Sequence, residues 1–326
     1  MEANMKYVYQ LYLDRSFSKA AEHLYMTQPA LSIAIKRVEA ELGAELFDRS
    51  RHPLELTQAG EAYIATIRQI RHLEEELQRE VDDLKQLGHG TLRLGGTHYI
   101  LNYILADALA DFAGAHPGVT IDLEEGSARR LTGMLRDREL DLTFSCAAEV
   151  LEEFEHVPAF SDHILLAVPE RAAPEAVLDR ALTAEDILAG RHLSGDVPPV
   201  TLDHFRESEF ILMRPGNNLH ERSMKMFRDA GVTPHVRLSL SQLVTEFHLA
   251  EEGLGAAFVS DRLVRSPTPG LRYFLPDSPE AERQFCFILP PRQYTPFAVK
   301  EFLEFAKQRL AGTKNSPQDC FLDAPA

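Results

Sequence analysis

The sequence is poor in cysteine and has no long run of apolar residues. Its three cysteines, Cys146, Cys286 and Cys320, are odd in number and lie far apart, which indicates a reduced compartment and shows no spacing typical of a metal site. No stretch approaches the roughly 18 uninterrupted apolar residues of a membrane span. The N-terminus has no basic segment followed by an apolar run, so no secretory signal is expected. These absences predict a cytoplasmic protein with no membrane partner.

Positive charge is also scarce. The formal net charge of −16 argues, at first sight, against nucleic acid as a partner. The first 60 residues, however, hold seven Lys or Arg and eight Asp or Glu, so this segment is nearly neutral and the acidic excess lies in the rest of the chain. That distribution allows a local face for phosphate groups, although charge alone does not predict one.

The composition is that of a soluble globular protein, with 44% hydrophobic and 26% charged residues. A length of 326 residues predicts two or three domains, each large enough for its own core.

The first 60 residues show the pattern of a winged helix-turn-helix. Apolar periodicity predicts two short helices, over residues 5–14 and from about Ser18 to residue 24. Thr27 is suited to cap a third helix, and Gly43 is suited to end it. The second and third helices are joined by a tight turn at residues 25–27. Two helices joined in this way are typical of a helix-turn-helix. Two short strands are expected to form a wing behind it, at residues 47–49 and 54–56.

A long helix is predicted next, because residues 60–87 contain no proline and no internal glycine. Apolar residues recur there at steps of four and three, which is a heptad seam long enough for a helix pair. We expect a dimerisation surface made of Ile67, Ile70, Leu77, Val81 and Leu84.

Beyond residue 90 strands and helices alternate, which predicts parallel-rich sheets covered by helices. Strands are expected at residues 91–95, 119–124, 141–145, 164–168, 210–213, 235–240, 255–259, 271–275 and 284–289. Helices are expected at residues 102–115, 128–138, 219–230, 241–251 and 295–310. The stretch 171–199, rich in Ala, Pro and Gly, is expected to be an irregular surface region, and the polar tail 312–326 to be disordered.

The N-terminal segment closely resembles the LysR-type regulators. The resemblance is carried, in order, by SFSKAAEHL, TQPALS, ELG, LFDR and LTQAG, at residues 16–24, 27–32, 41–43, 46–49 and 56–60. A weaker resemblance extends to about residue 310 through the short runs at 92–95, 140–142, 215–216 and 253–257.

The resemblance implies an α/β fold with a winged helix-turn-helix at 1–60, a linker helix at 61–88 and a two-lobed α/β sensing domain like a periplasmic binding protein. Lobe 1 would take residues 91–168 with 268–311, and lobe 2 residues 169–267. It also implies double-stranded operator DNA as a partner, a small-molecule effector between the lobes, and a homodimer or homotetramer. RNA polymerase is left open as a further partner.

The third helix would be the recognition helix. Gln28, Ser32 and Lys36 lie four residues apart and share one face; Gln suits adenine, and Lys suits guanine or phosphate. Contacts with the DNA backbone are expected from Thr27, Arg37, Arg49 and Arg51. On an isolated helix all of these would be ordinary solvated residues. The family often has a basic residue and then Gln after the serine, where this chain has Ile33 and Ala34. The resemblance therefore implies no particular operator sequence for this chain.

Three strand-to-helix turns carry hydroxyl or amide side chains. Exposed N–H groups at such turns suit a carboxylate or phosphate. The predicted effector-binding residues are Thr97, His98, Ser127, Asn217 and Asn218. Each alone can be a simple helix cap, and His98 can be a surface histidine, but the cleft implied by the resemblance would bring the turns together around a small anion. A histidine beside that anion would make its binding sensitive to pH.

Sequence motifs of enzymes are missing. The Gly-x-Gly pairs at 88–90 and 253–255 lack the third glycine of a dinucleotide fingerprint, and no Walker loop, nucleophile elbow or zinc-peptidase motif occurs. We expect no catalytic residue, no metal and no cofactor. A ligand-independent DNA-binding regulator remains the alternative. A peroxide-sensing disulfide between Cys146 and Cys286 ranks below their interpretation as small buried residues.

Overall fold

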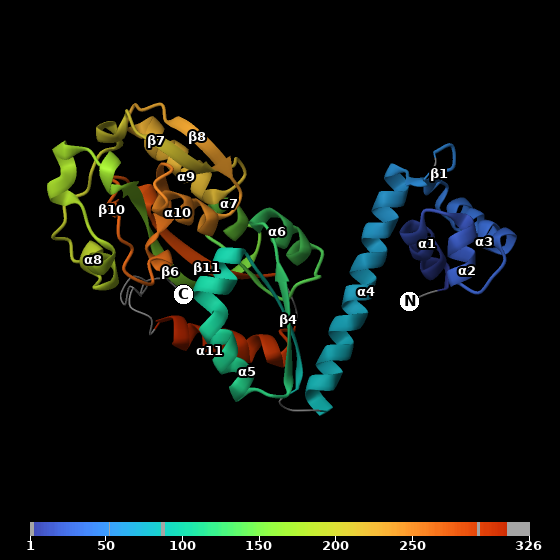
Figure 1. Cartoon of the computed structure of the whole chain (residues 1–326). Coiled ribbons are helices and arrows are strands. Elements are labelled where there is room, and N and C mark those ends of the chain that lie inside the picture. Colours follow the sequence, from blue (N-terminus) through green and yellow to red (C-terminus); the bar gives the residue numbers. More distant parts are fainter. Residues whose placement is uncertain (1–2, 52, 86–88, 292–293, 312–326) are drawn as a thin grey trace, which may run out of the picture. The chain divides into compact units, whose positions relative to one another are not determined.

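The structure, a computed structural model, describes residues 3–51, 53–85, 89–291 and 294–311. The chain forms two compact units, Met1–Gln86 and Leu87–Ala326 (Figure 1). The predicted tail at 312–326 lies outside the described residues.

The N-terminal unit consists of three short helices, a two-stranded wing and one long helix. In chain order these are α1 Ala3–Asp14, α2 Phe17–His23, α3 Gln28–Leu42, β1 Phe47–Asp48, β2 Glu55–Leu56 and α4 Gln58–Lys85. The predicted winged helix-turn-helix is confirmed, with one correction: α2 begins after Ser16 rather than at Ser18. The ends of α3 are as predicted. The Thr27 hydroxyl accepts a hydrogen bond from the Ala30 N–H at 3.4 Å, and Gly43 has the left-handed φ of 70° that ends many helices.

The core of this unit is built from the apolar faces of α1, α2 and α3 and from the start of α4. Its fully buried members include Val8, Leu11, Leu31, Ile35 and Ile67. Because α4 contributes to this core, its first turns belong to the folded N-terminal unit.

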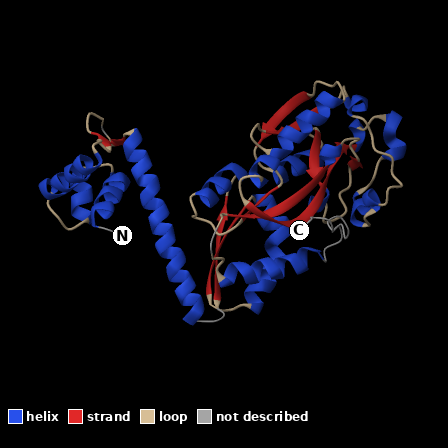
Figure 2. Cartoon of the chain, turned by 180° about the vertical axis from the view of Figure 1, so that it is seen from behind, coloured by secondary structure: helices blue, strands red, loops and turns tan. Residues whose placement is uncertain are grey.

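The C-terminal unit combines sheets with helices on their faces (Figure 2). Its strands are β3 Gly90–Gly96, β4 Val119–Glu125, β5 Thr143–Ser145, β6 Glu155–Pro169, β7 Glu209–Met213, β8 His235–Leu240, β9 Ala256–Ser260, β10 Leu271–Phe274 and β11 Glu282–Leu289. Its α-helices are α5 Ala106–Ala115, α6 Ala128–Arg136, α7 Ala148–Leu151, α8 Ala184–Leu188, α9 Asn218–Asp229, α10 Leu243–Glu251 and α11 Phe297–Ala311. Shorter helical pieces are the π-helical η1 Ile100–Leu105 and the 3-10 turns η2 Glu170–Ala172, η3 Glu175–Arg180, η4 Arg191–Leu193, η5 Leu202–Phe205, η6 Asp261–Leu263 and η7 Pro279–Ala281.

The long strand β6 joins the two lobes of this unit. One sheet has the strand order β5-β11-β6-β9-β7-β8, with β10 also beside β6, and a second pairs β3 with β4 in parallel. The first part of β6 pairs with β11 in lobe 1, whereas its last part pairs with β9 and β10 in lobe 2. The predicted strand 164–168 is therefore only the apolar end of a strand that begins at Glu155. The ladders place β10 with lobe 2, although the prediction put it in lobe 1.

The prediction of an irregular surface region at 171–199 is wrong. This stretch forms η3, α8 and η4 and buries Val177, Leu182 and Ile187 against the unit's main core. Backbone hydrogen bonds in both directions between Leu182 and Tyr273 tie it to β10. The segment 170–205 is therefore a packed part of lobe 2.

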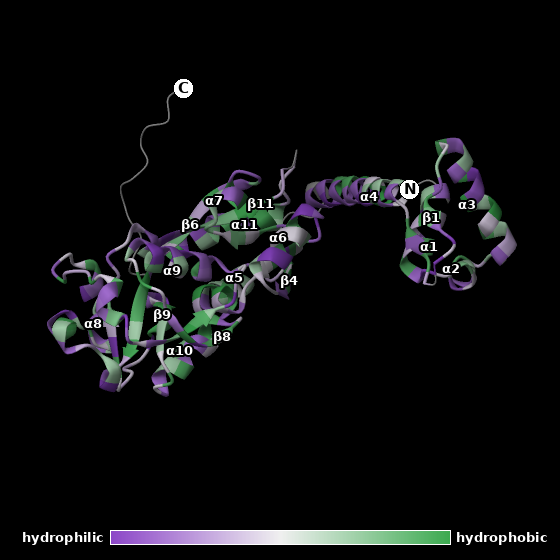
Figure 3. Ribbon diagram, turned by 90° about the horizontal axis from the view of Figure 1, so that it is seen from above, coloured by the Kyte–Doolittle hydropathy of each residue, from purple (hydrophilic) through white to green (hydrophobic). Residues whose placement is uncertain are grey.

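No helix in the described part of the chain is long and apolar enough to cross a membrane. Polar and apolar residues alternate along the helices, including α4 (Figure 3).

Candidate DNA-binding surface and effector cavity

Helix α3 turns one polar face outward. Gln28 and Lys36 are exposed and Ser32 is half-buried, while the opposite side of the helix packs into the core through Leu31, Ile35 and Val38. The three predicted base-contacting residues therefore lie away from the core side of α3. Ile33 shares the accessible surface of α3 and is 69% exposed.

The basic residues predicted to contact DNA differ in their ion pairs within the chain. The Arg37 Nε donates to Glu41 at 3.1 Å, and the Arg51 Nη1 donates to Glu55 at 2.7 Å. Both pairs are exposed, so they contribute little stability and can be exchanged for a phosphate. Lys36 has no ion pair among the described residues.

Arg49 has a structural contact within the N-terminal unit, and its contact with the DNA backbone stays a prediction. Its Nη2 donates to the Glu39 carboxylate at 2.6 Å, and its guanidinium lies over the Phe17 ring at 5.5 Å. Glu39 is only 8% exposed and also accepts a hydrogen bond from the Leu46 N–H at 2.9 Å. Removing Arg49 would leave a buried charge without its partner, which is costly. Arg49 therefore ties α3 to the wing.

The predicted dimerisation seam is also corrected at its start. Ile67 is fully buried in the core of its own N-terminal unit, so it is not available to a partner helix. Further along α4, Ile70 and Val81 are half-buried and Leu77 is 62% exposed. Leu73, which lies between Ile70 and Leu77, is 60% exposed. The side chain of Leu84 lies outside the described residues.

A cavity of about 1150 Å³ lies in the C-terminal unit. Four of the five predicted effector-binding residues line it: Thr97, Ser127, Asn217 and Asn218. They come from the turns after β3, β4 and β7, and three of them also act as caps. The Ser127 Oγ accepts the Arg130 N–H at 3.3 Å, and the Asn217 Oδ1 accepts the Leu219 N–H at 2.9 Å. The Thr97 hydroxyl accepts the Ile100 N–H at 3.4 Å.

His98, the fifth residue, is not among those that line the cavity. Its Nδ1 lies 3.5 Å from a Glu125 oxygen and 3.2 Å from the Asn102 amide nitrogen. Its side chain is 38% exposed. The His98 side chain thus contacts Glu125 and Asn102 and does not line the cavity.

The sequence reading missed a buried charge pair at the cavity wall. Arg283 lines the cavity, and its Nε donates to Asp162 at 2.8 Å. The hydroxyl of Tyr99, which also lines the cavity, donates to the same carboxylate at 2.8 Å. Burial opposes charge on Arg283, but the ion pair with Asp162 outweighs it and raises the pKa of Arg283. Burial and the charge of Asp162 both raise the pKa of Tyr99. Arg283 therefore keeps its positive charge, and Tyr99 stays a neutral phenol.

Two arginines in the cavity wall also escaped the sequence analysis. Arg129 in α6 and Arg228 in α9 are exposed, line the cavity from different lobes and have no ion pair among the described residues. A signal was present for each. Arg129 lies two residues after the predicted turn residue Ser127, and Arg228 ends a series of cations spaced three apart on α9 that begins at Arg222.

Cys146 lines the cavity, and its thiol donates to the Asn218 side-chain oxygen at 3.2 Å. Burial raises the pKa of Cys146 to about 11, and burial also raises the pKa of Cys286. Because the thiolate is the reactive form, both thiols are in surroundings that suit inert cysteines.

Two family models match the chain. The bacterial regulatory helix-turn-helix protein, lysR family, matches residues 3–61, and the LysR substrate binding domain matches residues 85–311. The chain belongs to the LysR family of transcriptional regulators. Members of this family are regulators rather than enzymes, in line with the absence of catalytic motifs from the sequence.

Relatives of this LysR-type regulator match it over most of its length. The uncharacterized HTH-type transcriptional regulator YcgK of Bacillus subtilis is 28% identical over 95% of this chain and 94% of its own. The HTH-type transcriptional regulator CfxR of Cupriavidus necator is 29% identical over 75% of this chain and 71% of its own.

Solved structures share the fold. Full-length CbnR complexed with its target DNA has a TM-score of 0.63 at 19% identity, covering 95% of this chain and 100% of its own. The effector binding domain of QuiR in complex with shikimate has a TM-score of 0.53 at 14% identity, covering 69% of this chain and 99% of its own.

Proposed function

We propose that this LysR-type regulator binds a two-fold-related operator through α3, as a homodimer or homotetramer, and that a small carboxylate or similar anion in the cavity controls it. The observation that carries the proposal is the convergence of three helix-starting turns on one cavity of about 1150 Å³. Thr97, Ser127 and Asn217 were predicted from their strand-to-helix turns and from the family resemblance, and they line the same space.

The local chemistry of the cavity favours an anion. Helix N-termini present N–H donors and a positive partial charge, and two of them, those of α6 and α9, open into the cavity. Arg129 and Arg228 add two cations that no carboxylate of the described chain neutralises. A neighbour in fold, the effector domain of QuiR, binds shikimate, which is itself a carboxylate.

The acidic character of the whole chain opposes anion capture only at long range. At physiological salt, screening acts over about 8 Å, so donors inside the cavity decide the outcome. Several cavity cations are already balanced: Arg136 is paired with Glu153, and Arg222 with Glu280. The pair Arg129 and Arg228 is thus the part of the wall best suited to carry the ligand's charge.

Control of DNA binding requires that the anion bind two arrangements of the protein unequally. The position of the cavity supports such a difference, because its wall comes from turns of both lobes, and β6 and β10–β11 connect those lobes. An anion held by Arg129 in one lobe and Arg228 in the other would favour a closed arrangement.

The test is a thermal-shift screen of the full chain with small organic acids, each beside its uncharged amide. We expect one or more acids, and not their amides, to raise the melting temperature. For such an acid, Thr97→Val and Ser127→Ala should each weaken binding about ten- to a hundredfold, the effect of losing one charge-assisted hydrogen bond. Arg129→Ala and Arg228→Ala should weaken it at least as much.

Arg206→Ala is the matched control, because Arg206 is an exposed arginine of the same unit that does not line the cavity. If acids bind the cavity variants and the wild type equally, the site is wrong. If no acid or amide in a broad screen shifts the melting temperature, while the operator is still bound, a ligand-independent regulator becomes the better description.

A further inference from the structure

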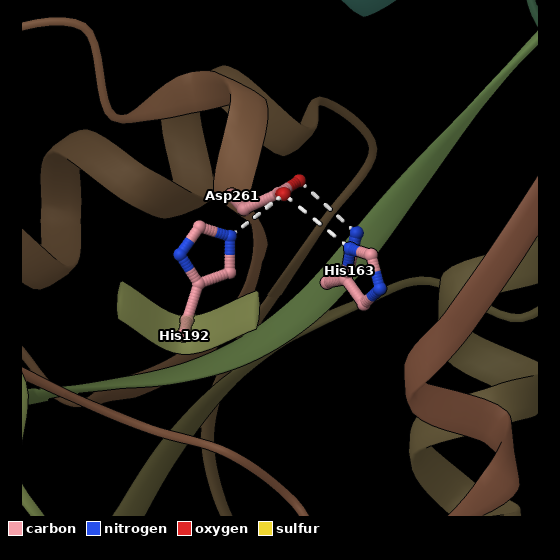
Figure 4. Close-up of side chains that lie close together, drawn as sticks. All are labelled: His163, His192 and Asp261. Carbon is pink, nitrogen blue, oxygen red and sulfur yellow. Dashed lines mark hydrogen bonds and ion pairs between the residues drawn. The ribbon is translucent and has the colours of Figure 1, made fainter. Parts of the chain in front are cut away.

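A cluster of two histidines and one aspartate lies outside the effector cavity (Figure 4). His163 is on β6, His192 is on η4 and Asp261 opens η6 after β9. The three residues are far apart in the sequence, so no local spacing predicted that they would meet. His192 belongs to the 170–205 segment that the sequence analysis took for an irregular surface region.

The two imidazoles face the same carboxylate. The His192 Nε2 lies 3.1 Å from the Asp261 Oδ2, and the His163 Nδ1 lies 3.5 Å from that same oxygen. One ligand atom from each residue lies within 4.8 Å of the other two. The other Asp261 oxygen accepts the His163 backbone N–H at 3.0 Å, which fixes the orientation of the carboxylate.

The cluster is buried on one side and open on the other. The side chains of His192 and Asp261 are each 2% exposed, whereas that of His163 is 29% exposed. The Nδ1 of His163, which lies 3.5 Å from the Asp261 Oδ2, is buried and forms no hydrogen bond among the described residues. A buried polar atom without a hydrogen bond is unusual in a purely structural contact.

We propose that this cluster is a binding site for a divalent transition-metal ion such as Zn²⁺. The ligands are the Nδ1 of His163, the Nε2 of His192 and the Oδ2 of Asp261, and a water molecule enters from the exposed side of His163 as the fourth. Two imidazoles and one carboxylate suit Zn²⁺ and its neighbours in the first transition row rather than Ca²⁺ or Mg²⁺, which prefer oxygen ligands alone.

The distances fit such an ion with a small adjustment. Bonds of about 2.0–2.1 Å in a tetrahedral site place ligand atoms about 3.4 Å apart. The two nitrogen-to-oxygen distances are already close to that value, so the two imidazoles alone must approach each other. His163 is the more exposed of them and has the room to move.

The electrostatics of the cluster also favour a cation. A dication between the three groups neutralises the carboxylate and uses the lone pairs of both imidazoles.

A bound ion would link three elements of lobe 2. It would tie η4, and with it the 170–205 segment, to the strand β6 and to the end of β9. The residues preceding two of the ligands, Asp162 and Ser260, hydrogen-bond Tyr99 in the cavity wall, each at 2.8 Å. The metal site thus lies next to the cavity without sharing its lining residues.

The experiment uses the full chain, without a histidine tag and stripped with a chelator. Zn²⁺ is titrated in competition with a chromophoric chelator, and Co²⁺ is titrated while its visible spectrum is recorded. We expect one ion per chain and the intense bands of tetrahedral Co²⁺. His163→Gln should weaken Zn²⁺ binding by at least about tenfold and abolish those bands. Because His163 is partly exposed, this variant should fold.

Asp261→Asn is the second variant, since it keeps the shape of the side chain while removing its charge. His248→Ala is the control: His248 forms an exposed histidine–carboxylate pair with Glu251, and neither residue belongs to the cluster. Zn²⁺ binding lost in both cluster variants and kept in the control supports the site. No binding by the wild type, or equal binding by all four proteins, overturns it. DNA binding is not read in this experiment, so the outcome is independent of the proposed effector.

Discussion

Lys36 differs from the other predicted DNA-contacting cations because it is exposed and has no ion pair among the described residues. Arg37 and Arg51 would each have to leave an acidic partner to bind phosphate, and Arg49 is paired with the buried Glu39. Lys36 has no ion pair within the described residues to lose when it binds phosphate. Among these four cations, it should therefore contribute the largest share of the affinity for DNA.

Lys36→Ala should weaken operator binding about equally across DNA sequences and reduce the slope of log affinity against log salt by about 1, as expected when one phosphate contact is lost. Gln28→Ala should instead relax the preference at a single base pair, at a cost of about 1–3 kcal/mol. Gel-shift titrations at several salt concentrations measure both. Lys307→Ala, an exposed lysine of the C-terminal unit, is the control. If the Lys36 and Gln28 variants bind like the wild type, α3 is not the recognition helix.

Glu246 in α10 is a second single residue that leads to a prediction, here on the pH dependence of stability. It is fully buried, and neither carboxylate oxygen has a well-formed hydrogen bond among the described residues. Burial raises its pKa well above the ordinary 4.5, and the Phe258 N–H offsets only part of this effect. The folded state thus keeps its proton at pH values where the unfolded chain has lost it.

Glu246 should therefore make the folded state less stable as pH rises. Above pH 4.5 the unfolded state gains from ionising Glu246 and the folded state does not, so stability falls as pH rises through the raised pKa. Glu246→Gln removes this loss. Urea unfolding should find the variant more stable than the wild type at pH about 8, with the gap closing toward pH 4.5. The exposed Glu152→Gln should show no such gap. A gap that does not change with pH would refute the explanation.

At the scale of elements, α4 has two parts with different tasks. Its beginning completes the core of the N-terminal unit through Ile64 and Ile67. Its later turns expose Leu73 and Leu77, at 60% and 62%. Large apolar side chains that are exposed on a solvated helix have reason to be covered by a second helix. The expected dimerisation surface therefore begins after Ile67.

Leu73→Asp combined with Leu77→Asp should reduce the oligomer size, because it places charges in an apolar helix pair without partners for them. Light scattering during size exclusion measures the mass, and circular dichroism should show that the units remain folded, since neither leucine is buried within the chain. Gln69→Asp, an exposed polar position on the same helix, serves as the control. An unchanged mass in the double variant would mean that the chain assembles through another surface.

At the scale of the whole molecule, the two units must communicate if the anion controls the operator. An anion that binds the cavity and changes operator affinity by some factor must have its own affinity changed by the same factor when operator is bound. We expect this equality to hold within error for any acid found in the thermal screen, measured by calorimetry with and without operator DNA. Arg228→Ala should remove both effects together. Unequal factors would show that the acid acts at a second site.

The sequence by itself determined the family, the winged helix-turn-helix and most strands and helices of the C-terminal unit. These features are local: a cap at Thr27, a left-handed glycine at Gly43, apolar repeats, and short motifs in a constant order. The turn positions Thr97, Ser127 and Asn217 could be located for the same reason, because a strand followed by a helix indicates where the cap lies; their role toward an effector stays a prediction.

The tertiary structure alone decided which side chains meet. In the sequence, Arg49 is a basic residue near the predicted wing, and only the fold places it beside the buried Glu39. Ile67 fits the heptad pattern, but the fold buries it in the core of the N-terminal unit. The first half of β6 was missed because polar residues interrupt its apolar pattern. His163, His192 and Asp261 lie on three elements that carry no common motif. Contacts between residues so distant in sequence are set by how elements pack, and packing energy depends on shape and burial in three dimensions, which no local pattern records.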